Sequence, residues 1–142
     1  MPNQNILRPM WRTDHHTADV RIHVNAGSLR ELFAHAVRAL TEVMEPQAST
    51  SRNDAAFAVK VDAADSTLLL VDFLNAALTA SHIHRYAFTD VDFQWFEPTR
   101  LAATLIGQRV RGFAEDVKSV TYHEASVARE GEVWSVTLVL DI

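Results

Sequence analysis

Two acidic residues near opposite ends of the sequence lie where predicted strands begin and end. Asp19 opens the alternating segment 19–25, and Asp141 follows the alternating segment 134–140. If these strands are antiparallel neighbours, the start of one lies beside the end of the other, and the two carboxylates meet. The last residue, Ile142, would bring its α-carboxylate to the same place. Such a concentration of negative oxygen atoms suits a hard cation such as Ca²⁺ or Mg²⁺.

The same spacing has a simpler explanation, because strand-end acids commonly accept hydrogen bonds from neighbouring turns. From spacing alone this explanation is the more common one for Asp19 and Asp141. Histidines are a second set of candidates: His15 and His16, close to acidic residues, could bind a transition metal, although surface or capping roles are more usual. His123 lies in a predicted strand, where it would be either a buried hydrogen-bonded residue or part of a site.

The apolar periodicity predicts two helices and about six strands. Residues 29–44 have apolar side chains at helical spacing after a capping box at residues 28–31. A second helix is predicted over residues 67–80, with Asp65 or Ser66 as its N-cap. The predicted strands are residues 19–25, 57–61, 86–96, 101–107, 117–128 and 134–140. This order predicts an α+β fold, a single two-layer α/β sandwich with two helices packed on a largely antiparallel sheet.

Two irregularities are predicted within the strands. In residues 86–96 the apolar positions change from even to odd numbers, which requires a β-bulge near Thr89 and Asp90. Gly107 is expected to end or bend the strand that starts at Leu101.

Composition limits the classes of protein that the chain can belong to. Its 142 residues suit one domain, residues 14–142, preceded by a flexible leader, residues 1–13. There is no cysteine, which excludes disulfides and thiolate metal sites. No apolar run approaches the roughly twenty residues of a membrane span, so a cytoplasmic protein is expected. The net charge of -5 and the scattered basic residues argue against strong direct binding of nucleic acid.

No known catalytic signature accompanies these features. The sequence contains no nucleophile elbow, no phosphate-binding glycine loop and no zinc motif. Its four glycines are too few for a phosphate cradle. The aromatic residues of segment 86–96 are not surrounded by basic residues in the sequence, so packing in the core is favoured over stacking on nucleic-acid bases.

Four parts of the sequence, in order, resemble the archease family. The first is the His-Thr-Ala-Asp-Val segment 16–20 together with the glycine and capping box of residues 27–31. The second is segment 65–75, the third is Val-Lys-Ser-Val-Thr-Tyr-His at residues 117–123, and the fourth is the end of the chain, residues 134–142. Each motif is modest alone, whereas their order over one short chain is specific.

The resemblance implies a non-enzymatic role. Archeases are protein cofactors of the GTP-dependent RNA ligase of the RtcB type, which joins tRNA exon halves; they promote guanylylation of the ligase and its multiple turnover. The family fold is a compact α/β domain that binds a divalent metal ion, usually Ca²⁺, with Mg²⁺ or Mn²⁺ as alternatives. The matching ligands in this chain are Asp19, Asp141 and Ile142. The resemblance therefore favours the metal site over the simpler explanation.

The sequence departs from the family pattern at several positions. His15 stands where an acid is usual, Arg21 replaces a frequent glycine, and Gln108 stands where glutamate is frequent. Two other functions remain as alternatives: a stand-alone metal-dependent phosphate hydrolase, and a chaperone-like interaction module that needs no metal.

Overall fold

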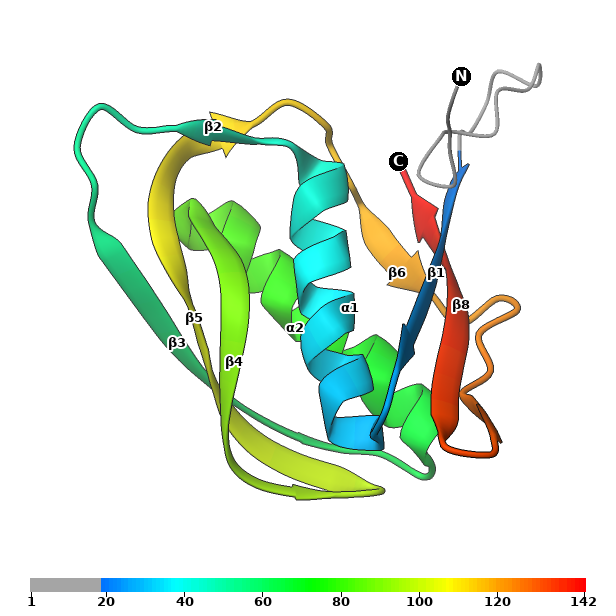
Figure 1. The fold of residues 1–142 in the computed structure, drawn as a ribbon. Coiled ribbons are helices and arrows are strands. Elements are labelled where there is room, and N and C mark those ends of the chain that lie inside the picture. Colours follow the sequence, from blue (N-terminus) through cyan, green and yellow to red (C-terminus); the bar gives the residue numbers. More distant parts are fainter. Residues whose placement is uncertain (1–18) are drawn as a thin grey trace.

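The computed structural model describes residues 19–142, which form two helices and eight strands (Figure 1). The predicted leader, His15 and His16 lie outside the described residues. In chain order the elements are β1 (Asp19–Ala26), α1 (Leu29–Met44), β2 (Pro46–Ala48), β3 (Asp54–Asp62), α2 (Ser66–His84), β4 (Tyr86–Glu97), β5 (Arg100–Phe113), β6 (Ser119–Thr121), β7 (Ala128–Glu130) and β8 (Val133–Asp141).

The strands form two antiparallel sheets. In one, β8 is central and pairs with β1, β6 and β7; in the other, β5 is central and pairs with β2, β3 and β4. Figure 1 shows the two helices between these sheets, and both helices contact strands of each sheet. The predicted α+β class, with two helices and largely antiparallel strands, is confirmed, and the strands are divided between two sheets instead of forming the single sheet that was predicted. The strands number eight rather than about six, because β2 and β7 are three-residue strands too short for a readable alternation.

Helix α1 forms as its sequence predicts. The Glu31 N–H donates to the Ser28 hydroxyl at 3.1 Å, which is the main bond of the capping box. The apolar side of the helix is buried against β1 and β4. The helix ends at Glu45, whose left-handed backbone (φ 53°) lets its N–H reach the Glu42 carbonyl.

Helix α2 is longer than predicted and is capped by Asp65, which accepts a hydrogen bond from the Leu68 N–H at 2.9 Å. Apolar residues lie nearly all round it, because it contacts α1, β6 and the strands of the β5 sheet. By length and composition alone α2 passes as a membrane span, but half of its most apolar stretch is buried inside the fold. A buried core helix accounts for the same composition, so this is weak evidence for a membrane.

The predicted bulge in β4 is confirmed, since its register against β5 shifts between Phe88 and Asp90. Gly107 does not end β5, which continues to Phe113. The glycine is needed for a different reason: a Cβ on Gly107 would lie 1.8 Å from the Ala87 carbonyl oxygen of β4. The glycine therefore permits the close approach of two strands.

The strand predicted over residues 117–128 is wrong. The chain forms the short strand β6, then a loop over residues 122–127, and then β7. His123 lies in this loop with 72% of its side chain exposed, so it is not a buried strand residue. The loop forms no strand ladder and is held by side chains, as the Val127 N–H shows by donating to the Thr67 hydroxyl of α2 at 2.9 Å.

Candidate metal centre

The ladder between β1 and β8 places Asp19 directly opposite Asp141. Figure 1 shows the end of β8 beside the start of β1, as the strand-end argument predicts. Directly opposed residues project from the same face of a sheet, with Cβ atoms about 4.5–5.5 Å apart. The next pair, Val20 and Leu140, is buried, so the two aspartates project from the outer face, where both are partly exposed. The predicted meeting of the two residues is confirmed; cation binding stays a prediction.

Strand β6 completes the surroundings of Asp141 on the other side. Ser119 is its register partner there, and the Lys118 N–H donates to the Asp141 carbonyl at 2.7 Å. The main-chain oxygen of Asp141 is therefore engaged within the sheet. Among residues 19–142 no side chain forms a hydrogen bond or ion pair with its carboxylate, and Ser119 projects from the same face of the sheet.

The donor set determines which ion would fit. Within residues 19–142, no three side chains of His, Cys, Asp or Glu gather closely enough to hold a metal. A cation at this place would use the carboxylates of Asp19 and Asp141, main-chain oxygen of Ile142, and water. Oxygen-only donors suit Ca²⁺, Mg²⁺ or Mn²⁺ rather than a metal that prefers nitrogen or sulfur. The residues present thus fit a hard divalent cation.

A basic residue stands next to the two acids. Arg21 follows Asp19 by two positions on β1, and its guanidinium forms an ion pair with the Glu124 carboxylate, including an Nη2–Oε2 contact of 3.3 Å. The hydrogen bond from Arg21, followed by its charge, lowers the pKa of Glu124 against the opposing effect of desolvation. The same hydrogen bond raises the pKa of Arg21, with a smaller contribution from Asp19. Sequence reasoning found Arg21 but missed Glu124, which lies in the segment that was predicted as a strand.

A polar hollow of about 390 Å³ continues along the outer face from this ion pair. His23 and Thr137 lie in it, and their Nδ1 and Oγ1 atoms are 2.7 Å apart. The covering loop is tied to α2 by the Tyr122 hydroxyl, which donates to Asp72. This hydrogen bond, together with the Asp72 charge, raises the pKa of Tyr122. The hollow therefore offers several hydrogen-bonding groups.

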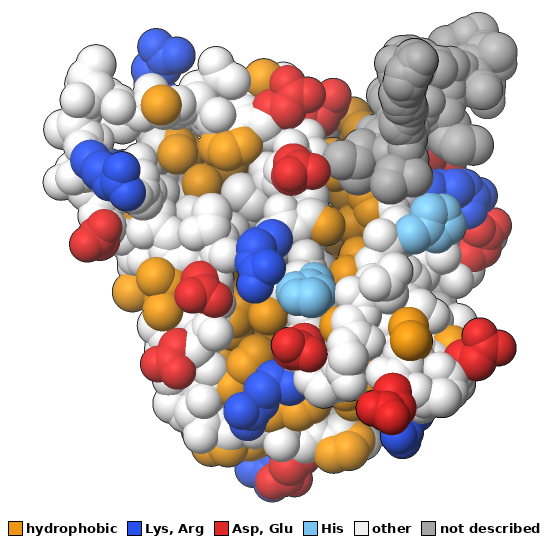
Figure 2. Space-filling view, in the orientation of Figure 1, with side chains coloured by type: hydrophobic (Ala, Val, Ile, Leu, Met, Phe, Trp, Pro, Cys, Tyr) orange, Lys and Arg blue, Asp and Glu red, His pale blue; other side chains and the backbone are white. Residues whose placement is uncertain are grey.

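Another hollow, of about 680 Å³, lies on the other sheet, between β2, β4 and β5. Gln108 lines it and, with its amide oxygen turned toward Arg52, accepts two hydrogen bonds from that guanidinium. None of its lining residues is Asp19, Asp141 or Ile142. The departure from the family pattern at Gln108 is therefore remote from the acid pair. Figure 2 shows acidic and basic side chains intermingled over the visible face, without a continuous basic patch.

Fold and site together define a small α+β protein in which two carboxylate residues, Asp19 and Asp141, are paired where strands β1 and β8 meet. The sequence profile of the Archease protein family (MTH1598/TM1083) matches residues 11–142. The chain belongs to the archease family, as its motifs predict. Family membership supports a role as a protein cofactor.

Relatives of known name agree with this assignment. Protein archease of Pyrobaculum neutrophilum is 30% identical over 93% of this chain and 95% of its own length. Protein archease of Pyrococcus abyssi is 29% identical over 93% of this chain and 98% of its own length.

Two solved structures share the fold. One is the crystal structure of an archease from Thermotoga maritima, described as a possible chaperone, with a TM-score of 0.64 and 20% identity over 94% of this chain and 98% of that one. The other is the solution structure of protein 1598 of Methanobacterium thermoautotrophicum, with a TM-score of 0.64 and 21% identity over 87% of this chain and 92% of that one. At these identities the likeness concerns the fold alone.

Proposed function

We propose that this protein activates a GTP-dependent RNA ligase of the RtcB type in tRNA splicing and RNA repair, in the cytoplasm. It acts as a protein cofactor and not as an enzyme, by promoting guanylylation of the ligase and its repeated turnover. It acts through a bound divalent cation, for which we propose Ca²⁺, and the ligands of this cation are Asp19, Asp141 and Ile142. A divalent cation stabilises the negative charge that develops during phosphoryl transfer.

The observation that carries the proposal is the direct pairing of Asp19 with Asp141 in a chain of the archease family. Two carboxylates from opposite ends of the chain face outward at one point, where a partner protein can reach them. The net charge of -5 disfavours RNA binding by the protein alone, so action through a protein partner is favoured.

The decisive experiment is a multiple-turnover ligation assay with the ligase of the same organism, comparing the natural protein with Asp141→Ala. We expect the variant to lose the activation. The matched control is Asp62→Ala, which removes an acid with 84% of its side chain exposed on β3 of the other sheet. Full activation by Asp141→Ala would remove the basis of the proposal.

Cation binding is measured separately from ligation. A ligand that binds only the folded state stabilises it by about 2.7 kcal/mol at a hundredfold excess over its Kd. We therefore expect Ca²⁺ to raise the Tm of the natural protein and of Asp62→Ala, and to leave that of Asp141→Ala unchanged.

The part played by Ile142 has its own test. Residues fused after Ile142 would displace its terminal oxygens and weaken Ca²⁺ binding, whereas the same tag fused before Met1 would not. Equal affinity of both tagged proteins would exclude the α-carboxylate of Ile142 as a ligand.

A metal-independent interaction module is the second candidate, because the Thermotoga maritima relative is described as a possible chaperone. Removing divalent cations from the activator with a chelator, followed by desalting, distinguishes the two. Unchanged activation by the stripped protein, in an assay that supplies only the ions required by the ligase, would favour the second candidate.

A further inference from the structure

Arg21 stands where it could block a cation site. It and Asp19 are two residues apart on β1, so their side chains project from the same face about 7 Å apart. Asp141 is its diagonal neighbour across the β1–β8 ladder, since Arg21 is paired with Val139. Long side chains reach diagonal neighbours at this spacing. A guanidinium laid against either carboxylate would occupy the place of a cation and repel one nearby.

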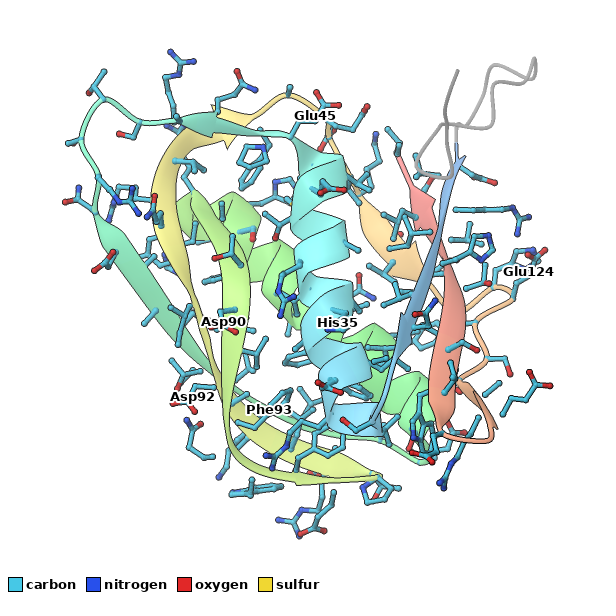
Figure 3. The ribbon with its side chains drawn as sticks, viewed as in Figure 1. His35, Glu45, Asp90, Asp92, Phe93 and Glu124 are labelled. Atoms are coloured by element: carbon cyan, nitrogen blue, oxygen red, sulfur yellow. The ribbon has the colours of Figure 1, made fainter. Side chains whose placement is uncertain are left out.

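Glu124 gives the guanidinium another partner. Its two carboxylate oxygens face two nitrogens of Arg21, a paired geometry that fixes the direction of the arginine side chain. Figure 3 shows Glu124 on the loop beside β1 and β8, on the side away from α1. The side chains are 34% and 44% exposed, so the pair is a surface feature, and its effect on stability is small.

The loop is built to present Glu124. It is anchored to α2 on both sides of the glutamate, by the hydrogen bond from Tyr122 to Asp72 and by the one from the Val127 N–H to Thr67. Glu124 itself has a left-handed backbone (φ 60°), which a residue other than glycine adopts at a cost in free energy. Such a conformation persists only where its surroundings hold it.

We propose that Glu124 is a positioning residue for the cation site, because its ion pair with Arg21 holds the guanidinium away from Asp19 and Asp141. The idea rests on the proposed function, since it presupposes a cation at the two aspartates. The Glu124 carboxylate neutralises the charge of Arg21 and holds its long side chain away from the two aspartates.

The test measures the Kd for Ca²⁺ by isothermal titration calorimetry in the purified natural protein and in five variants. Glu124→Gln keeps the size of the side chain and releases Arg21, so we expect Ca²⁺ binding to weaken by about three- to tenfold. Arg21→Gln removes the competing charge and should bind Ca²⁺ as tightly as the natural protein or more tightly. The double variant Arg21→Gln with Glu124→Gln should return to within about twofold of the natural Kd, because no guanidinium remains to be held.

Glu132→Gln is the fourth variant and the matched control, since it makes the same change of charge next to the start of β8, the end remote from Asp141. It should leave the Kd unchanged. Glu124→Gln with the natural Kd, or a double variant as weak as Glu124→Gln alone, would overturn the inference. The second result would assign Glu124 a purely structural role.

Asp141→Asn, measured in the same titrations, separates this inference from the proposed function. If Asp141→Asn abolishes Ca²⁺ binding and Glu124→Gln does not change it, the inference fails and the cation site stands. If the natural protein binds no Ca²⁺, or binds it no better than Asp141→Asn, both fail together.

Discussion

The side chain of Asn75 on α2 forms the hydrogen bonds that a neighbouring strand would form at the edge of β6. Its side-chain nitrogen donates to the Val120 carbonyl at 2.8 Å, and its oxygen accepts from the Val120 N–H at 2.9 Å. The same nitrogen lies 3.1 Å from the Val71 carbonyl. Through these bonds Asn75 fixes the position of β6, whose Ser119 faces Asp141 across the sheet.

Replacing Asn75 with alanine leaves both main-chain groups of Val120 without a partner. Val120 is only 2% exposed, so water reaches these groups poorly. An unsatisfied buried donor or acceptor costs about 1–3 kcal/mol. Since the space left by the missing amide admits some water, we expect Asn75→Ala to lower the free energy of unfolding by about 2–4 kcal/mol. This is a large part of the roughly 5–15 kcal/mol that stabilises a typical domain.

Urea unfolding followed by circular dichroism measures the loss, with the slope of the transition checked for constancy. Asn25→Ala is the matched control, because Asn25 is exposed on β1 and its bond to His35 uses the main-chain carbonyl, which the variant keeps. We expect the control to stay within about 0.5 kcal/mol of the natural protein. Amide hydrogen exchange at Val120 should accelerate in Asn75→Ala more than the global loss of stability requires. A loss below about 1 kcal/mol, or unchanged exchange at Val120, would refute the assignment of Asn75 as an edge partner.

Three further predictions concern other parts of the fold. Gly107→Ala should lower the free energy of unfolding by about 3 kcal/mol or more because its Cβ would strike β4, whereas Gly112→Ala, with nothing within 4 Å, should be nearly neutral in the same urea titration. Tyr122 should titrate above its ordinary pKa in an absorbance titration, and Asp72→Asn should return it toward that value. Since folding raises this pKa, the stabilisation is present below the unfolded pKa of about 10 and is lost as the pH rises through the folded value. Ser28→Ala should cost about 1 kcal/mol in thermal unfolding because α1 loses its N-cap; no change in Tm would contradict that role.

The main elements could be predicted because their burial is one-sided and regular. In β1, the alternation of Val20, Ile22 and Val24 with polar residues reflects one buried face, and such a face also limits the register. The meeting of the two acids followed from the same reasoning, since each lies at the end of a regular strand. No spacing rule, however, shows that β1 and β8 are neighbours in one sheet, and that step needed either the structure or the family resemblance.

The strand predicted from the apolar pattern of residues 117–128 was wrong for a physical reason. Val117 and Val120 are both buried although they are three residues apart, a spacing that differs from the alternation of a strand. The segment beyond them is held by side chains of α2 and not by a continuous ladder. The spacing of apolar residues predicts which residues are buried, but it does not predict which helix or strand covers them. Glu124 was missed as a consequence, because its importance comes from an ion pair with a residue 103 positions earlier in the chain.

The two parts of the site therefore differ in how firmly they are held. Asp19 and Asp141 form the end pair of a ladder of eight register pairs, and Asp141 is also paired with Ser119 of β6. The Arg21–Glu124 pair depends on a loop with a strained residue and a few side-chain bonds, so it can open while the sheet stays intact. If a cation binds at the aspartates, its coordination is set by the sheet and its affinity is adjusted by the loop. Changes in the loop should consequently alter the Kd without abolishing binding, whereas changes at Asp141 should abolish it.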